Sequence, residues 1–212
     1  MVRAILEGKK TQTRRILKIQ PHPEAELRSI IPRPNAVGSC VSFAHVDGRG
    51  IHSHSLTLYC PYGMPGDRLW VRETWGLFND LGFCDTSLVG LKQLPRPWQL
   101  AYRTDHVDPV NGDGPHRPYW RPSIFMPRWA SRITLEITGV RVERLQQVSE
   151  ADARAEGAIG ALNSSVGNNW CAREAFAALW ESIHGTDSWD ANSWVWVVEF
   201  RRLETARQEV AP

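Results

Sequence analysis

Residues 8–15, GKKTQTRR, bring two lysines, two threonines and two arginines together in one short stretch. A lysine acts as a general base only after it has lost its proton, and both nearby cations and burial lower a lysine pKa. We therefore predict that Lys10, which has other cations on both sides, accepts a proton from a threonine hydroxyl. Positions 10 and 13 of one strand point to opposite faces, so Lys10 must precede the strand to meet Thr13. From composition alone, the alternative is a solvated basic edge without chemistry.

Other nucleophile, cofactor and metal motifs are absent from the sequence. The chain has no GxSxG elbow, no Walker loop, no GxGxxG after a strand and no HExxH pair. Five potential metal ligands lie close together in sequence: Cys40, His45, His52, His54 and Cys60. Their spacings match no zinc-finger or ribbon pattern, so we predict an exposed histidine-rich loop, with no metal and no cofactor.

Composition and charge are those of an ordinary globular protein. Of 212 residues, 42% are hydrophobic and 23% are charged, which argues against wholesale disorder. Lys plus Arg is 25 and Asp plus Glu is 23, and the resulting net charge of +2 does not by itself predict a polyphosphate binder. No stretch reaches the roughly 18 apolar residues of a membrane-spanning helix, and the N-terminus is unlike a signal peptide. We expect a cytoplasmic protein whose four dispersed cysteines are reduced.

Tryptophan is unusually frequent, with 10 in the chain. A buried indole removes a large apolar area from water, so we expect most of these side chains to build the core. A few can instead stack on a nucleobase, and composition does not distinguish the two roles.

We expect few helices and strands in the N-terminal half, and these elements must position the basic segment. Residues 2–7 read as the end of a short helix that stops at a glycine, and a strand begins near Thr11. Residues 20–65 are rich in Pro, Gly and His and are expected to form an insertion or long loops, with a hairpin around SLTLYC. A short strand at residues 68–72 follows a Pro-Gly-Asp turn, and residues 76–127 again look loop-like, apart from a strand at WQLAYR.

The C-terminal half has a clearer pattern. Residues 131–145 alternate apolar and polar side chains like a strand with a bulge at Gly139, and residues 149–157 read as a helix capped by a serine and ended by a glycine. Residues 172–184 form a second helix, and residues 194–203 a strand buried on both faces. The apolar face of that second helix is expected to contain Phe176, Leu179, Trp180 and Ile183. About five or six strands and two or three short helices favour an α+β class, as a small β-barrel with peripheral helices.

Four motifs, in this order, resemble the ASCH domain family, which has a PUA-like β-barrel fold. They are GKKTQTRR, PGDRLWVRE, a strand followed by SEADARAEG, and the closing WVWVVEF. More narrowly, CPYGMPGDRLWVRETW and RPSIFMPRWASRI are similar to long ASCH proteins of bacteriophages and prophages. The resemblance implies one PUA-like domain over residues 1–203, a small mixed barrel with insertions at about 20–64 and 76–125, and a polar tail at 204–212. Because the family has a strand before its first helix, we expect either a missing barrel strand or a start upstream of Met1.

The same resemblance implies chemistry on RNA or on a modified nucleoside, without a metal. Some short members of the family hydrolyse the amide of N4-acetylcytidine to cytidine and acetate, using a Lys, a Thr and a Glu. Carried over by motif, these residues are Lys10, Thr13 and Glu156. In this hypothesis Thr13 attacks the carbonyl carbon and Lys10 takes its proton, while Glu156 orients Lys10 or protonates the leaving N4.

Further residues are expected to contact the substrate or a nucleic acid: Lys9, Arg14, Arg15, Gly66, Asp67, Arg72 and Glu73. Arg15 is a candidate contact for an oxyanion or a phosphate, and Glu73 is expected to pair with an arginine at the rim of the cleft. Two alternatives stay open, a non-catalytic RNA- or DNA-binding module and a ribonuclease. The expected partner is a modified nucleoside or RNA, with no membrane and no obligate protein partner.

Overall fold

The structure, a computed structural model, forms two compact units. It describes residues 1–31, 40–46, 52–79, 82–84, 99–105, 120–158 and 171–204. The first unit consists of residues 3–69 and 135–202, and the second mainly of residues 70–134, within those described ranges. Each unit has apolar clusters of its own.

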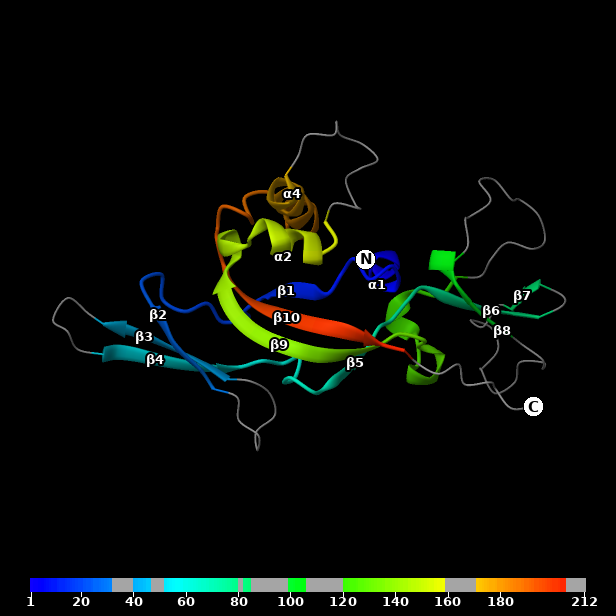
Figure 1. Ribbon diagram of the computed structural model, residues 1–212, viewed down its shortest axis with the longest axis horizontal. Helices are drawn as coiled ribbons and strands as arrows, with labels where there is room; N and C mark the ends of the chain where they lie inside the picture. Colours follow the sequence, from blue (N-terminus) through cyan, green and yellow to red (C-terminus); the bar gives the residue numbers. More distant parts are fainter. Residues whose placement is uncertain are drawn as a thin grey trace. The chain divides into compact units, whose positions relative to one another are not determined.

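A curled four-stranded sheet dominates the first unit and bends like half of a barrel (Figure 1). Its strands, in spatial order, are β1 (Gln12–Ile16), β10 (Trp194–Leu203), β9 (Thr134–Arg144) and β5 (Arg68–Trp70). An antiparallel three-stranded sheet contains β2 (Glu26–Ile31), β3 (Cys40–Val46) and β4 (His52–Tyr59). β1 therefore lies at an edge of the curled sheet and pairs antiparallel with β10.

Strand β10 is buried on both faces because its alternate side chains enter two different clusters. Trp194, Trp196 and Val198 belong to one cluster, together with Val41 and Phe43 of β3. The neighbouring Val195 and Val197 point to the opposite face and belong to the other cluster, which the helices complete. β10 thus divides the first unit into a strand side and a helix side.

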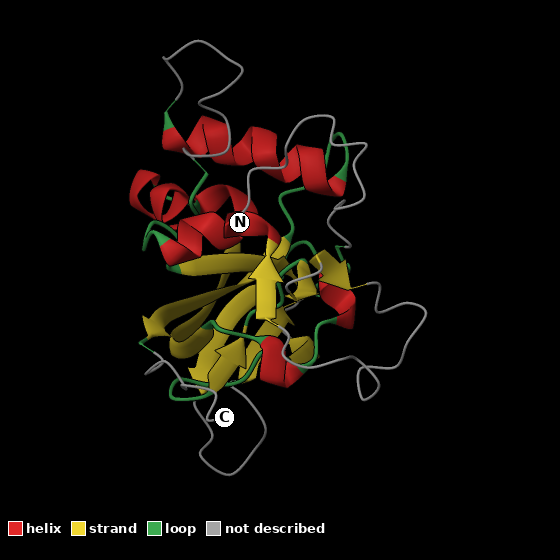
Figure 2. Cartoon of the chain, turned by 90° about the vertical axis from the view of Figure 1, so that its right-hand side faces the viewer, coloured by secondary structure: helices red, strands yellow, loops and turns green. Residues whose placement is uncertain are grey.

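Within the described residues, three helices accompany the curled sheet: α1 (Val2–Leu6), α2 (Glu150–Ala155) and α4 (Ala172–His184). Helices α2 and α4 pack side by side over one face of the sheet (Figures 1 and 2). A short 3-10 helix, η5 (Leu145–Gln147), connects β9 to α2, which begins at Ser149. The Ser149 Oγ accepts a hydrogen bond from the Asp152 backbone N–H at 3.1 Å, which satisfies one free donor of the first turn. Gly157, at φ 75°, then ends the helix.

The second unit is built on a small antiparallel sheet. Its strands are β6 (Trp75–Asn79), β7 (Gly82–Cys84) and β8 (Gln99–Tyr102), with β6 in the centre. The described part of this unit also contains three 3-10 turns: η2 (Arg103–Asp105), η3 (Ser123–Phe125) and η4 (Arg128–Ala130). The cluster beneath this sheet contains Trp75, Leu77, Met126 and Ala130.

The α+β class and most of the clearly patterned elements are confirmed. The first helix ends at Leu6, shortly before Gly8 with its φ of 71°, and the strand after it begins at Gln12. The predicted helices near residues 149–157 and 172–184 are present, as is the closing strand with its run of buried side chains. On β9 the buried positions change from odd to even between Ile137 and Val142, which fits the irregularity predicted at Gly139.

Several expectations are wrong within the described residues. Residues 20–65 contain the strands β2, β3 and β4 and not mainly loops, because apolar residues of β3 enter the main core despite the polar composition around them; the hairpin expected around SLTLYC is present as β3 and β4. Residues 76–127 include β6 and β7 as well as the expected β8. Ile183 of α4 is 61% exposed, so the buried stripe of this helix ends one turn earlier, at Trp180. The expected second insertion falls in the second unit, and residues 205–212 of the predicted tail lie outside the described part.

Candidate functional site

A turn between α1 and β1 places Lys10 against the end of α2. The backbone N–H groups of Lys9 and Lys10 both donate to the Ala4 carbonyl, at 2.8 and 3.0 Å, which closes the turn after the helix. The Thr11 N–H then donates to the Ala155 carbonyl at 2.8 Å. Lys10 therefore precedes the strand, as the sequence predicted, and its Cβ lies close to Gly157. A Cβ on Gly157 would stand 3.3 Å from that of Lys10, so this approach favours glycine.

Lys10 and Glu156 form a buried ion pair across 146 positions of sequence. The Lys10 Nζ donates to the Glu156 Oε2 at 2.7 Å and to the Glu156 backbone carbonyl at 2.8 Å. The two residues are only 6% and 7% exposed. Two of the three predicted catalytic residues therefore meet, and their charges are held away from solvent.

Arg14 completes the shell around Glu156. Its guanidinium lies 3.1 Å from the Glu156 Oε1, so the two carboxylate oxygens are bound by two different cations. The same guanidinium contacts Glu143 at 2.5 Å and Asp152 at 3.5 Å, and it lies over the ring of Phe176 at 5.6 Å. Because Arg14 is only 2% exposed, it belongs to this internal network and presents no surface to a phosphate, contrary to its predicted role in binding nucleic acid.

A second arginine, Arg141 of β9, extends the network towards solvent. It contacts Glu143 at 3.1 Å and Asp152 at 2.9 Å, and it also binds Glu199 of β10. Gln12 donates to the Asp152 backbone carbonyl at 2.7 Å and so ties β1 to α2. Three cations of this network thus face four carboxylates. The cations are Lys10, Arg14 and Arg141, and the carboxylates are those of Glu143, Asp152, Glu156 and Glu199.

Burial changes the acid–base behaviour of Lys10. Removal of the ammonium group from water lowers the pKa of Lys10 below its ordinary value. The Glu156 carboxylate acts in the opposite direction, while the nearby Arg15 and Arg14 guanidinium groups add to the lowering. Since the net direction is downward, the neutral amine of Lys10 is easier to reach than that of a solvated lysine.

Thr13 lies on the other face of β1. Its register partner on β10 is Val198, which belongs to the strand-side cluster, whereas Arg14 is paired with Val197 on the helix side. Glu156 contacts Arg14, so Thr13 and Glu156 lie on opposite sides of the strand. The structure therefore joins Lys10 to Glu156 and does not place the Thr13 side chain with them. Arg15 shares the face of Thr13, and its guanidinium donates to the Arg14 carbonyl at a long 3.4 Å.

The other binding candidates of the first unit lie at its surface. Lys9 pairs with Glu7 at 2.7 Å, and its side chain is 66% exposed. Gly66 has φ 96°, and its N–H donates to the Ile137 carbonyl at 2.8 Å, which fixes the turn before β5. The Asp67 carboxylate accepts from the Met64 N–H at 2.8 Å within the same turn. Both residues of this Gly-Asp pair therefore have a structural role as a turn.

The remaining candidates, Arg72 and Glu73, belong to the second unit. Glu73 is 1% exposed and accepts two hydrogen bonds from Arg132, at 3.0 and 2.9 Å, and one from Thr104 at 2.9 Å. The predicted pairing of Glu73 with an arginine is thus confirmed, but its expected place at the rim of a cleft is not, because the carboxylate is buried within the second unit. Arg72 is exposed and lies over the ring of Trp70, 4.8 Å from its centroid, while donating to the Ile124 carbonyl at 3.1 Å.

The cysteines and histidines of residues 40–60 are spread along two paired strands, with Cys40 at the start of β3 and His45 near its end. Cys40 and Cys60 are buried, whereas Cys171 is exposed. The His45 side chain lies beside His22 and Glu24, two residues from outside the segment 40–60. The side chains of His52 and His54 are outside the described part of the structure.

Sequence reasoning missed Glu143, Arg141 and Asp152, which surround Arg14. A signal was available in GVRVERL, where charged residues of opposite sign alternate with valines along one strand. Arg132 was missed as well, although a buried glutamate in a mostly apolar segment requires a cationic partner.

Comparisons with protein-family models, with curated proteins and with solved structures find no match for this chain. None of the described helices has the length and apolar composition that a membrane crossing requires. The candidate site is therefore interpreted from its own geometry and from the motifs.

Proposed function

We propose that the chain is a PUA-like ASCH protein that removes an acyl group from an N4-acylated cytidine without a metal. The observation that carries this proposal is the buried Lys10–Glu156 pair. The motifs alone selected these two residues, and they meet although 146 positions separate them. A surface salt bridge would need no such explanation, whereas burial of two opposite charges is costly and is often retained for a specific purpose.

The geometry around the Lys10 Nζ suits a general base. A protonated lysine has three N–H donors and no acceptor, whereas the neutral amine has two donors and one lone pair. Both hydrogen bonds to Glu156 can persist after Lys10 loses its proton, so the lone pair is directed away from the carboxylate. The lowered pKa brings this neutral form closer to working pH, where a base is most effective.

In the proposed reaction Lys10 removes a proton from the nucleophile, which adds to the acyl carbonyl carbon. The C–N4 bond then breaks, the proton passes from Lys10 to N4, and cytidine and the carboxylic acid leave. Because Thr13 lies across β1 from Glu156, we favour a water molecule as the nucleophile over the Thr13 hydroxyl. Arg15 shares the face of Thr13, so the same argument leaves Arg15 out of the proposed reaction.

The experiment is incubation of the purified chain with N4-acetylcytidine, followed by chromatographic measurement of cytidine and acetate. Thr13→Val, which removes the hydroxyl and keeps the shape, distinguishes the two nucleophiles. Retention of most activity is expected, and a loss comparable to that of Lys10→Arg would assign the attack to Thr13. If wild-type protein releases no cytidine, even from acetylated RNA oligonucleotides, the hydrolase proposal is wrong.

A second candidate function, binding of a single-stranded nucleic acid, is favoured by one surface of the second unit. Arg72 and Arg128 lie over the ring of Trp70, at 4.8 and 5.7 Å, and Arg121 lies over Trp75. Exposed apolar side chains accompany them: Ile124, Phe125 and Trp129. Guanidinium groups on aromatic rings beside exposed aromatics provide both phosphate attraction and base stacking.

This second candidate is tested by titrating labelled single-stranded RNA at several salt concentrations. If the surface binds the strand, the double variant Arg72→Ala/Arg128→Ala weakens the affinity and reduces its salt dependence, because fewer counterions are released. Arg201→Ala, which removes an exposed arginine of the first unit, is the matched control. Cleavage of the RNA in the same assay would instead support a ribonuclease.

A further inference from the structure

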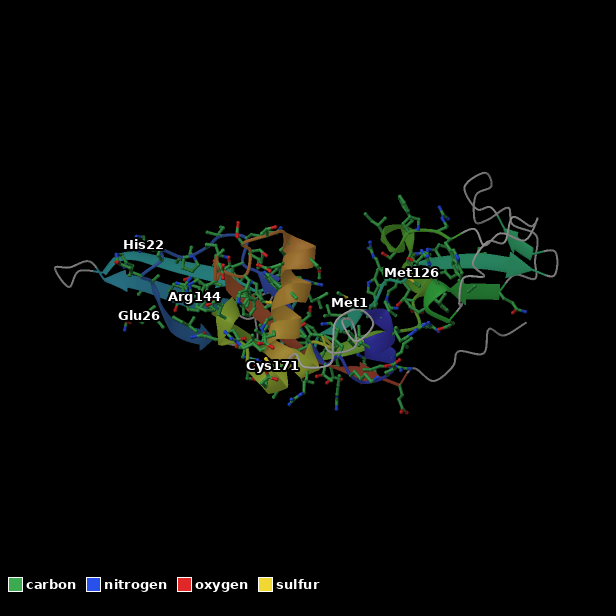
Figure 3. All side chains as sticks on the ribbon, turned by 90° about the horizontal axis from the view of Figure 1, so that it is seen from above. Met1, His22, Glu26, Met126, Arg144 and Cys171 are labelled. Carbon is green, nitrogen blue, oxygen red and sulfur yellow. The ribbon has the colours of Figure 1, made fainter. Side chains whose placement is uncertain are left out.

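A tight turn before β2 holds two potential metal ligands in a fixed backbone. The Ala25 N–H donates to the His22 carbonyl at 2.8 Å, and Ala25 itself is 8% exposed. The Pro23 carbonyl accepts a hydrogen bond from Arg144 at 2.8 Å, and the Arg144 guanidinium lies over the ring of Trp194. The turn is therefore fastened to the core of the first unit at both its end and its middle. Figure 3 shows His22 and Arg144 near one another at this end of the first unit.

The third potential ligand comes from the end of β3. His45 is the register partner of His54 on β4, and the register of the two strands shifts directly after it. The His45 side chain is 15% exposed, so it lies at the border between core and solvent. Its ring stacks on that of His22 with 4.2 Å between the centroids, and its Nε2 lies 3.9 Å from the Glu24 carboxylate.

We propose that His22, Glu24 and His45 form a site for a divalent transition-metal ion of the zinc type. One ligand atom from each residue lies within 4.8 Å of the other two. Two ligands of a tetrahedral zinc ion stand about 3.3 Å apart, so the exposed His22 and Glu24 side chains need only small rotations to converge. Two imidazoles and one carboxylate are ligands that zinc accepts, and a water molecule supplies the fourth.

Backbone and ring contacts orient the two imidazoles. The His22 Nδ1 accepts a hydrogen bond from the Glu24 backbone N–H at 3.3 Å, which fixes the His22 ring beside the residue that carries the carboxylate ligand. The stacking of the His22 and His45 rings keeps the second imidazole next to the first.

The site is independent of the proposed hydrolysis, because it uses none of Lys10, Thr13 or Glu156. Its ligands combine His45, from the histidine-rich stretch of the sequence, with a turn more than 20 positions earlier. Sequence spacing could not indicate this set, because the two segments meet only when β2 pairs with β3.

The test is equilibrium dialysis of the tag-free, chelator-treated chain against ZnCl₂, with CoCl₂ absorption spectra to report the ligand field. We expect one zinc ion per chain, and a visible cobalt spectrum typical of four or five ligands. His22→Ala and Glu24→Gln should each weaken zinc binding at least about tenfold, since each removes a ligand. His184→Ala, at the end of α4, removes an exposed histidine elsewhere and should bind zinc like the wild type.

His22 and Glu24 are exposed, so their substitution should leave the fold intact, and circular dichroism before metal addition checks this. His45→Ala is the third ligand variant. Because the His45 side chain is mostly buried, this substitution disturbs the packing more than the other two. Failure of the wild type to bind zinc would overturn the proposal. Equal binding by wild type and His22→Ala would overturn it as well, because the ion would then lie elsewhere on the chain.

Discussion

Among the described residues, each unit of the molecule buries one glutamate almost completely, and the two differ in the cation that faces the carboxylate. In the first unit Glu156 is held by Lys10 and Arg14. In the second unit Glu73 is held by Arg132 through two nearly parallel hydrogen bonds, with Thr104 as a third donor. An arginine keeps its proton in proteins, and the pairing with Glu73 raises the pKa of Arg132 further against the effect of its burial. Burial instead lowers the pKa of Lys10.

The Glu73 pair has a cation that keeps its proton, whereas the Glu156 pair has a cation that can lose its proton. Both glutamates need a cation, because an unpaired buried carboxylate would be strongly destabilising. Of these cations, only Lys10 can lose its proton. When it does, Arg14 remains beside Glu156 and balances the negative charge of the carboxylate. The presence of two cations at Glu156 thus frees one of them for proton transfer.

The largest expected effect is on turnover. Lys10→Arg keeps the positive charge and prevents deprotonation, so under the proposed function it lowers kcat for N4-acetylcytidine by about 100-fold or more. Lys9→Arg, one position away and exposed, should be nearly silent. Both variants are assayed for turnover, for nucleoside binding and for urea unfolding. Equal, near-wild-type turnover in the two would remove Lys10 as the base and favour the binding function.

The second effect concerns the stability of the second unit. Arg132→Ala leaves Glu73 buried without its ion-pair partner and should lower the free energy of unfolding by about 3 kcal/mol, measured by urea denaturation. The double variant Glu73→Gln/Arg132→Ala removes the unpaired charge and should recover part of that loss. No recovery in the double variant would mean that the packing of Arg132 against Tyr102, and not the ion pair, is decisive.

The third effect is a pH dependence that Lys10 has and Arg132 lacks. Below the lowered pKa of Lys10 the lysine is charged in both the folded and the unfolded chain, and the full cost of its burial remains. As the pH rises from there to the ordinary lysine pKa, the unfolded chain binds more protons, so the free energy of unfolding increases. One proton limits the slope to about 1.4 kcal/mol per pH unit.

The measurement is urea unfolding of wild type and Lys10→Met at a series of alkaline pH values. The difference between the two, which cancels the titration of other groups, should shift in favour of the wild type as the pH rises. Lys9→Met is the control. A constant difference would show that Lys10 titrates alike in the folded and unfolded states.

The smallest effect tests the helix that carries Glu156. Ser149→Ala removes the N-cap of α2 and should reduce the free energy of unfolding by about 1 kcal/mol. Ser182→Ala, which removes a hydroxyl bonded to its own helix α4, should stay within a few tenths of a kcal/mol of the wild type. Glu73 lies in an extended segment between β5 and β6, so its pairing with Arg132 should be insensitive to the Ser149 change.

Local elements were the most predictable part of the fold. The serine cap and terminal glycine of α2, the apolar stripe of α4 and the apolar run of β10 all act within a few residues, so short windows of sequence identify them. Of the strands β2, β3 and β4, only the hairpin around SLTLYC was predicted, because the buried residues of β3, Cys40, Val41 and Phe43, are few beside the surrounding Pro, Gly and His. The burial of Val41 and Phe43 depends on contact with β10, more than 150 positions later.

The sequence by itself determined which reactive side chains are present: a lysine in a cationic segment and a glutamate at the end of a short helix. The motifs associated these two residues. Only the tertiary structure decided which side chains share a face. The register of β1 on β10 sends Arg14 to the helices and Thr13 to the opposite side, and a shift by one residue would exchange them. The same holds for His22, Glu24 and His45, which strand pairing brings together. Register depends on the burial of both faces of a strand at once, and that is a property of the whole core and not of any local segment.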